Sequence, residues 1–460
     1  MMILGLLAGY FTLFAAGIGV ALLIMKGSPR LNLIECACLA WLFGVGVVSL
    51  LLWLGETFTS GIALQCLVAV LCLALGIVGW RTKQGRQAHF SLPRPKSTVE
   101  WILAGVLLLE LFIIFVVCLK HTLGWDGLLV WEIKARYAFL DSGVLPEAYY
   151  SSAGRAFSHP EYPLAIPFTE LWLYLWMGAP HQFWIKTIFP LFYIAGALLV
   201  ALFVTRLSGK PWLGLLAALL IPFVPFVTAS PGGVIVGYSD IPLSVFYLTA
   251  LGYLLCSLER NSPSALIAYA SILTLIPWIK SEGIILWSLL AAMGLIVGLR
   301  QHRLRPFLVA ILPGLFLITG WRVYLKAMHV VTASDFARPT FQLLRENLTR
   351  LGAIAGTAFA EITETSHWSI FWLLVLVAII YLLIARQLLR LLLAISVLGP
   401  IILYSLTYFF SAWPSYTAHM TSSLPRLLLH VMPAGWLAIG LALQLSAPKA
   451  QTGKLESKLD

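Results

Sequence analysis

Long apolar runs separated by short polar segments dominate this sequence. About thirteen runs approach the roughly twenty residues that an α-helix needs to cross the hydrocarbon core of a bilayer. They cover approximately residues 3–25, 32–54, 61–80, 101–120, 183–205, 211–229, 241–258, 264–279, 283–299, 306–325, 368–385, 390–410 and 426–445. The runs are too long and too uniformly apolar for the strands of a membrane barrel. The pattern therefore predicts an all-α polytopic membrane protein with about 13 transmembrane helices.

Composition points to lipid as the main solvent of the chain. Hydrophobic residues make up 60% of the 460 positions and charged residues 11%, with a mean hydropathy of +0.93. A soluble domain carries about 25% charged residues. A secreted enzyme, a nucleic-acid-binding domain and a disordered scaffold are therefore excluded. The six cysteines all lie within apolar runs, where we expect small hydrophobic side chains and neither disulfides nor a metal site.

Basic residues gather in alternate short loops and predict the orientation of the chain. The formal net charge is +11, and the basic segments lie near 26–30, 81–96, 206–210, 260, 300–305, 386–390 and 449–458. Lys and Arg are enriched in cytoplasmic loops and face anionic lipid there. All these segments fall on one side if every run crosses the bilayer. The N-terminus is then outside, the C-terminus is inside, and the charge implies no nucleic-acid partner.

Two apolar segments need a separate interpretation. Residues 2–25 are long enough to span and show no cleavage pattern, so we expect a retained helix and not a signal peptide. Residues 163–178 are apolar but short, contain two prolines and Glu170, and are rich in Trp and Tyr. Counting them as a span would break the charge pattern. We predict a helix in the outer membrane interface, where amphipathic aromatic side chains are favoured.

The segments predicted to face outward hold most of the polar residues without an obvious structural role. They are roughly 121–182, 230–240, 280–282, 326–367 and 411–425. Asp126, in Gly124-Trp125-Asp126-Gly127, stands where a predicted span leaves the membrane. A carboxylate that is partly desolvated there has a raised pKa and suits a general base. The alternative is that Asp126 caps the next helix.

Three further outer segments offer polar groups. Ser158-His159-Pro160-Glu161-Tyr162-Pro163 is a proline-fixed turn that suits substrate contact or plain loop structure. In Gly237-Tyr238-Ser239-Asp240, the aspartate opens a predicted span and either caps it or serves the site. Pro277-Trp278-Ile279-Lys280-Ser281-Glu282 joins two spans with little more than a Lys and a Glu. These two neutralise each other, or the lysine meets a lipid phosphate.

Arginines at outer helix ends complete the candidate set. Arg426 opens the last predicted span and Arg322 lies near the outer end of another. Both run against the usual cytoplasmic preference of basic residues, so they call for an anionic partner, and a phosphate fits the guanidinium fork. Acidic and cationic residues on one face suit a lipid-linked anionic substrate. A transporter more often places its charges near the midplane on broken helices.

The order of these segments resembles the GT-C glycosyltransferases that use polyprenyl-phosphate sugars, especially the protein O-mannosyltransferase and aminoarabinose-transferase type. That family has an acidic residue in its first outer loop, a proline-rich juxtamembrane helix, a basic cytoplasmic turn, an Asp-x-Pro-Leu-like motif and a Lys-containing outer turn. The corresponding positions here are Asp126, Glu161-Tyr162-Pro163-Leu164, Arg206–Lys210, Asp240-Ile241-Pro242-Leu243 and Lys280–Gly283. The resemblance covers roughly residues 101–300.

The resemblance implies a role for each candidate residue. Asp126 would be the general base of an inverting sugar transfer from a polyprenyl-phosphate donor to a glycan, lipid or protein acceptor. Asp240 would orient the site or share a divalent cation with Asp126; no other cofactor is implied. Donor phosphate would be bound by Lys280, Arg426 and Arg322. Substrate contacts would come from Glu132, Lys134, His159, Glu161, Tyr162, Tyr238 and Glu282.

The predicted organisation has four parts. Residues 1–100 hold three additional spans and a basic loop, 101–300 the GT-C-like module, 301–446 further spans and outer loops, and 447–460 a cytoplasmic tail. We expect a multi-pass protein of the plasma (inner) membrane with its site on the extracytoplasmic side. The alternative functions are a transporter or flippase of lipid-linked glycans or small solutes, and a structural assembly subunit. The sugar and the acceptor stay open.

Overall fold

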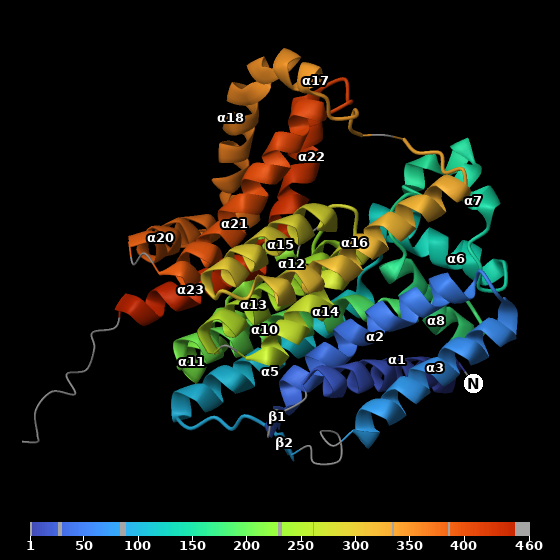
Figure 1. The fold of residues 1–460 in the computed structure, drawn as a ribbon, viewed down its shortest axis with the longest axis horizontal. Helices are drawn as coiled ribbons and strands as arrows, with labels where there is room; N and C mark the ends of the chain where they lie inside the picture. Colours follow the sequence, from blue (N-terminus) through green and yellow to red (C-terminus); the bar gives the residue numbers. More distant parts are fainter. Residues whose placement is uncertain are drawn as a thin grey trace, which may run out of the picture.

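The computed structural model is almost entirely helical (Figure 1). It describes residues 2–25, 30–82, 89–228, 232–260, 262–333, 335–384 and 387–446. The predicted tail after residue 446 and parts of the basic loops at 26–29, 83–88, 261 and 385–386 lie outside the described residues. Every predicted apolar run contains a helix. The prediction of an all-α polytopic membrane protein is therefore confirmed.

Nine helical segments within the described ranges are long and apolar enough to cross a bilayer. They are α1 (Met2–Ile24), α2 (Leu33–Gly55), α3 (Gly61–Arg81), α5 (Thr98–Lys120), α9 with α10 (Gln182–Ile185, Ile188–Ser208), α13 (Asp240–Arg260), α15 (Gly283–Arg300), α16 (Leu304–Ala327) and α21 with η6 (Leu388–Thr407, Tyr408–Phe410).

Four further apolar segments correspond to the remaining predicted runs. A bend of 51° joins α22 (Tyr416–Leu429) to α23 (Met432–Ser446), and together these helices pass the same length test. Three segments are shorter, namely α11 with η3 (Pro211–Leu219, Ile221–Phe223), α14 (Pro263–Ile279) and α20 (Phe371–Ile384). The count of thirteen crossings stays a prediction, because these short helices fall below the spanning length.

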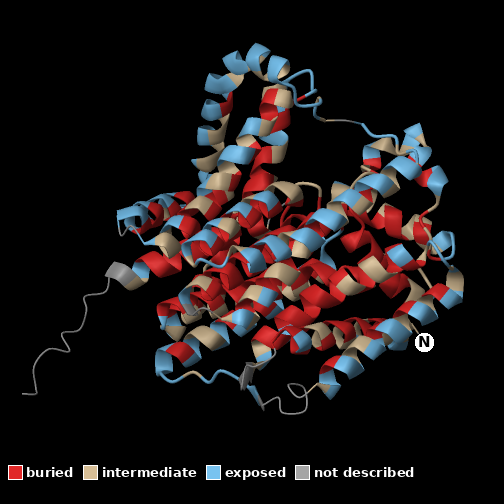
Figure 2. Cartoon of the chain, viewed as in Figure 1, coloured by how far each residue is buried: buried red, intermediate tan, exposed pale blue. Residues whose placement is uncertain are grey.

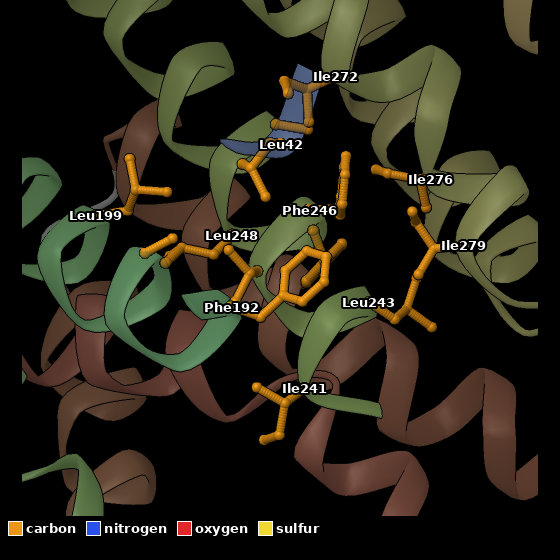
Figure 3. Packing of buried hydrophobic residues seen from close by; sticks show 14 of the residues in the cluster. Leu42, Phe192, Leu199, Ile241, Leu243, Phe246, Leu248, Ile272, Ile276 and Ile279 are labelled. Carbon is orange, nitrogen blue, oxygen red and sulfur yellow. The ribbon is translucent and has the colours of Figure 1, made fainter. Parts of the chain in front are cut away.

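Burial separates a central layer of helices from an outer layer. The spanning window of α13 is 94% buried, whereas those of α3 and α5 are 22% buried and that of α16 is 17% buried. Figure 2 shows the same contrast between a buried centre and exposed outer helices. Around α13, Phe246 and Leu248 pack with Phe192 of α10 and Ile276 of α14 (Figure 3). The exposed apolar faces suit contact with lipid.

Small residues allow the N-terminal helices to approach each other closely. A Cβ added at Gly17 of α1 would lie 1.8 Å from the backbone oxygen of Ala40 on α2. Close backbone contact of this kind is typical of helices packed within membranes. The three N-terminal helices therefore form one tightly packed unit that also contacts α8 (Ala165–Met177).

Helix ends predicted to face the cytoplasm lie together. The strand β1 (Arg30–Asn32) pairs in parallel with β2 (His89–Ser91), which joins the segment after α1 to the segment after α3. Nearby, Glu35 at the start of α2 accepts two hydrogen bonds from Arg206 near the end of α10, at 2.9 and 2.7 Å. These contacts agree with the alternation of basic loops.

The first outer segment folds as a chain of short helices. They are η1 (Gly127–Glu132), α6 (Ile133–Leu140), α7 (Glu147–Ser151), η2 (Ala153–Ser158) and α8. The helix predicted over 163–178 is present as α8. Its interfacial position stays a prediction, but protein surrounds its aromatic side chains: Trp172 and Tyr174 are fully buried, and the Trp172 indole donates to the backbone oxygen of Gly9 at 3.1 Å.

The remaining short elements surround the outer ends of the C-terminal helices. They are α12 (Pro225–Thr228), η4 (Val234–Val236), α17 (Phe341–Glu346), η5 (Leu348–Arg350), α18 (Leu351–Ile362) and α19 (Thr365–Trp368). In Figure 1, α17 and α18 project beside α22 at one side of the molecule. An antiparallel bridge between Phe336 and Ser411 ties the loop before α17 to the loop after η6. Both loops border the site.

Candidate functional site

Asp240 is the centre of a buried ionic cluster at the start of α13. Its side chain is fully buried. One carboxylate oxygen, Oδ1, accepts from Lys280 Nζ at 2.8 Å and from His430 Nε2 at 2.9 Å. The other oxygen, Oδ2, accepts from Arg426 Nη2 at 3.2 Å and Nε at 3.3 Å. Asp240 therefore accepts from three groups that belong to two other segments, the turn after α14 and the end of α22.

Two further carboxylates extend this cluster. Arg426 Nη2 also lies 2.6 Å from Asp126 Oδ2, so a single nitrogen bridges two aspartates. Lys280 Nζ lies 2.9 Å from Glu282 Oε1. Burial raises the pKa of Glu282, but the positive charge of Lys280 outweighs this effect and the net shift is downward. Asp126, Asp240, Lys280, Glu282 and Arg426 thus meet at one place, although they come from segments far apart in sequence.

Local backbone geometry explains why these side chains converge. Lys280 lies in a tight turn between α14 and α15, and Gly283 is required there because a Cβ would lie 2.3 Å from the backbone oxygen of Ile276. Arg426 and His430 lie one helical turn apart at the break between α22 and α23. Asp126 makes no side-chain cap hydrogen bond to η1, so its carboxylate is available to Arg426.

The cluster borders a cavity of about 740 Å³. Asp126, Lys280, Glu282 and Arg426 contribute to its wall, and the bridge-forming loops contribute Asp335, Phe336 and Trp413. Hydroxyl and aromatic side chains supply more of the lining, including Tyr404, Thr407, Phe410, His419, Ser422 and Ser423. Such a cavity, largely apolar with a few convergent charged groups, is typical of a small-molecule site.

His159, Glu161 and Tyr162 also line this cavity. The His159 ring stacks on Tyr162 with a centroid distance of 4.7 Å, and Nδ1 lies 3.1 Å from Glu161 Oε1. The backbone of His159 is left-handed, with φ of 49°. Burial lowers the pKa of His159, but the hydrogen bond and charge of Glu161 outweigh burial and raise it. The stack therefore brings a polar, chargeable ring to the cavity wall.

Arg322 and Tyr238 are absent from the described lining of this cavity. Arg322 lines an adjoining, mostly apolar pocket of about 260 Å³ between α14, α15 and α16. This pocket shares Glu161 and Ser281 with the larger cavity. Tyr238 packs its ring 4.8 Å from the Arg426 guanidinium carbon and is 5% exposed, so it supports the arginine from within the protein.

Glu132 and Lys134 lie in a separate buried cluster and are absent from the described lining of the cavity. Glu132 accepts from Arg136, Tyr174 and Gln182 at 2.6–2.9 Å. Lys134 donates to the backbone oxygens of Val130 and Ser158, and burial lowers its pKa to about 7. The structure gives these two residues a role in holding the outer segment together and no direct route to a substrate.

The sequence interpretation missed two members of the site. His430 is fully buried, and its second ring nitrogen, Nδ1, lies 3.0 Å from the hydroxyl of Tyr404. Since Nε2 faces the Asp240 carboxylate, it carries the proton and Nδ1 accepts from Tyr404. The available signal was the spacing of four residues from Arg426, which places both side chains on one face of a helix.

The cluster does not form a metal site within the described parts of the chain. No group of three or more His, Cys, Asp or Glu side chains is positioned there to hold an ion. The Arg426 guanidinium instead bridges Asp126 and Asp240, the two carboxylates proposed to share a divalent cation. The residues present do not fit that cation.

Similarity gives no family for this chain. Comparisons with protein-family models, curated proteins and solved structures find no match. The fold and the apolar helices define a multi-pass helical membrane protein, and a function has to be argued from the cavity and its charged wall.

Proposed function

We propose that this protein is an inverting glycosyltransferase that moves a sugar from a polyprenyl-phosphate donor to an acceptor at the outer face of the membrane. The observation that carries the proposal is the Arg426 guanidinium, held by buried Asp240 and paired with partly exposed Asp126 at the cavity wall. This arrangement places a phosphate-binding fork beside a carboxylate base. Inverting transfer from an anionic lipid-linked sugar needs both groups in one site, with the base on the face of the sugar opposite the phosphate.

The chemical step uses both Asp126 and Arg426. Asp126 takes the proton of an acceptor hydroxyl or amine as that atom attacks the anomeric carbon of the donor. The bond between the anomeric carbon and the phosphate oxygen breaks, and its electron pair leaves with the polyprenyl phosphate. Attack from the face opposite the phosphate inverts the anomeric centre. Arg426 stabilises the charge that develops on the leaving phosphate.

In this proposal Lys280 supports the cluster from within the protein and does not contact the phosphate directly. Its side chain is 3% exposed, whereas that of Arg426 is 19% exposed. Lys280 pairs with both Asp240 and Glu282 and compensates part of the charge of Asp240, so that Arg426 can pair with Asp126 as well. The adjoining apolar pocket, with Trp278, Leu317 and Trp321 in its wall, offers space for the first isoprene units of the donor. Arg322 at that pocket is a second cation for the phosphate or for neighbouring lipid headgroups.

The membrane placement of this activity follows from the sequence pattern. In this proposal the chain crosses the inner membrane thirteen times with its basic loops in the cytoplasm, so that the site faces the extracytoplasmic side. The GT-C-like arrangement rests on the resemblance of the sequence motifs. The acceptor is a glycan, lipid or protein that carries a free hydroxyl or amine.

The test is release of polyprenyl phosphate by the purified protein. Protein in nanodiscs is incubated with a panel of polyprenyl-phosphate sugars and a membrane extract as the acceptor source. We expect Asp126→Asn to lower release by about 10²- to 10⁴-fold, the usual contribution of a general base. Asp141→Asn is the matched control, since Asp141 lies exposed in the same outer segment. Equal release by wild type and Asp126→Asn would reject Asp126 as the base, and release by neither protein would reject the donor class.

A further inference from the structure

The two aspartates that share Arg426 are held in very different ways. Asp240 is fully buried and accepts hydrogen bonds from Lys280, His430 and Arg426. Asp126 is 20% exposed, lines the cavity, and pairs with Arg426 alone among the described residues. Arg426 therefore has one permanent partner and one partner that faces the cavity.

A phosphate would reach the guanidinium from the side that Asp126 occupies. The contacts with Asp240 use Nε and Nη2, and Nη2 is also the atom paired with Asp126. Tyr238 covers one face of the guanidinium at 4.8 Å. Arg426 lines the cavity, and the described contacts with the two aspartates do not use Nη1, so we take the edge formed by Nη1 and Nη2 as the one left for a ligand. Phosphate oxygens bind such an edge through two parallel N–H donors, which requires Asp126 to give up Nη2.

We infer that Asp126 and the donor phosphate compete for Arg426, so that binding of the donor releases Asp126 to act as the base. The inference rests on the proposed function and adds an order of events to it. While the site is empty, the ion pair holds the Asp126 carboxylate as a counter-ion. When a phosphate displaces it, Asp126 loses its cation and gains an anionic neighbour. Its carboxylate oxygens are then free to face the acceptor.

The ion pair between Asp126 and Arg426 also sets the order in which the two substrates can react. An acceptor that arrives first meets a carboxylate occupied by Arg426, so the base is not available before the donor is bound. Asp240 keeps Arg426 in place throughout the exchange because it also accepts from Nε, which Asp126 does not contact, although both aspartates share Nη2. Donor binding then precedes acceptor activation.

The competition predicts a tighter phosphate complex after loss of Asp126. Binding of polyprenyl phosphate in detergent micelles is measured by titration calorimetry, with inorganic phosphate as a second probe that lacks the lipid tail. We expect Asp126→Asn and Asp126→Ala to bind polyprenyl phosphate about tenfold more tightly than wild type, while transfer is lost. The melting temperature of each variant checks that the fold is intact.

The matched control is Asp141→Asn. Asp141 lies exposed in the same outer segment as Asp126 and is absent from the described lining of the cavity. We expect its phosphate affinity to stay within about twofold of wild type. Unchanged or weaker binding by both Asp126 variants would overturn the competition, as would equal tightening by the control. Absence of binding in every protein would reject the donor class and with it this inference, whereas tight wild-type binding without a variant effect rejects the inference alone.

Discussion

Two of the buried carboxylate clusters in the described parts of the chain have different roles. Glu35, at the end of the bundle with the basic loops, accepts from both terminal nitrogens of Arg206 and from the Tyr253 hydroxyl at 2.6 Å. Asp240, at the opposite ends of the helices, accepts from Lys280, Arg426 and His430. Both carboxylates are at most 2% exposed. Burial and strong pairing are therefore common to the two clusters.

The clusters differ in how the arginine is used. Arg206 donates from both terminal nitrogens to Glu35, in a bidentate pair that joins α2 to α10. Arg426 pairs with Asp240 and also with Asp126, which faces the cavity. Lys280 and His430 supply the remaining contacts of Asp240. The bidentate pair of Arg206 holds two helices together. An arginine such as Arg426, which has a partner that can be exchanged, can bind a ligand. The presence of a buried ion pair alone does not identify a site.

The largest expected effect comes from breaking the structural cluster. Glu35→Ala leaves Arg206 as a largely buried cation without its carboxylate, and we expect the free energy of unfolding to fall by about 3–5 kcal/mol. Reversible unfolding in mixed micelles measures this loss. Transfer per folded molecule should stay unchanged, because the cluster lies away from the cavity.

The double variant Glu35→Leu/Arg206→Met is the control for this prediction. Removing both charges with apolar side chains of similar size should recover most of the lost stability. A double variant as unstable as Glu35→Ala, or a loss of transfer per folded molecule, would contradict the division between a structural and a functional cluster.

A smaller effect is expected from the support of the functional cluster. His430 donates to Asp240 Oδ1 and accepts a hydrogen bond from the Tyr404 hydroxyl. Because this holds Asp240 in place, His430→Ala should lower kcat about tenfold with little change in the donor KM. His430→Gln retains an N–H donor and should recover part of that loss. Tyr404→Phe, which removes the outer link only, should lower kcat by about twofold. Equal losses in kcat for Ala and Gln, or a change confined to KM, would argue against a positioning role.

The sequence predicted the helices well because lipid imposes their composition. The spanning window of α16 is only 17% buried by protein, yet its apolar run is unmistakable, since lipid demands the same side chains as a core. α8 shows the limit of this logic. Its Trp172 and Tyr174 resemble interfacial aromatics, but both are buried in protein, where Trp172 contacts Gly9 of α1 and Tyr174 contacts Phe139 of α6. Composition alone does not distinguish lipid from protein as the apolar environment.

The charged members of the site were also accessible from sequence. Asp240 and Lys280 were candidates because they stand at helix ends predicted to face outward, and Arg426 because a basic residue there runs against the cytoplasmic preference. Glu132 was a candidate too, but it ends the π-helical η1 and accepts hydrogen bonds from Tyr174 and Gln182, so it belongs to another cluster. His430 was missed because a single histidine in an apolar run carries no sign of its partner. Only the bend between α22 and α23 brings it to Asp240.

The smallest expected effect concerns a third carboxylate, Glu56, which has neutral partners. Within the described residues it accepts from the Leu145 backbone N–H at 3.1 Å and the Tyr324 hydroxyl at 2.8 Å. Burial raises its pKa from 4.5 to about 7. The folded protein therefore binds this proton more tightly than the unfolded chain. Its contribution to stability is complete below pH 4.5 and is lost as the pH rises through about 7.

Glu56→Gln keeps a neutral side chain at every pH and isolates this contribution. We expect the wild-type melting temperature to fall by on the order of 3 °C more than that of the variant between pH 5 and pH 8. Comparing the two proteins removes the common titration of His159 and other groups. Parallel pH profiles would mean that Glu56 is ionised in the folded protein. In that case a carboxylate can be buried here without a cation, and the pairing of Glu35 and Asp240 with arginines would no longer follow from burial alone.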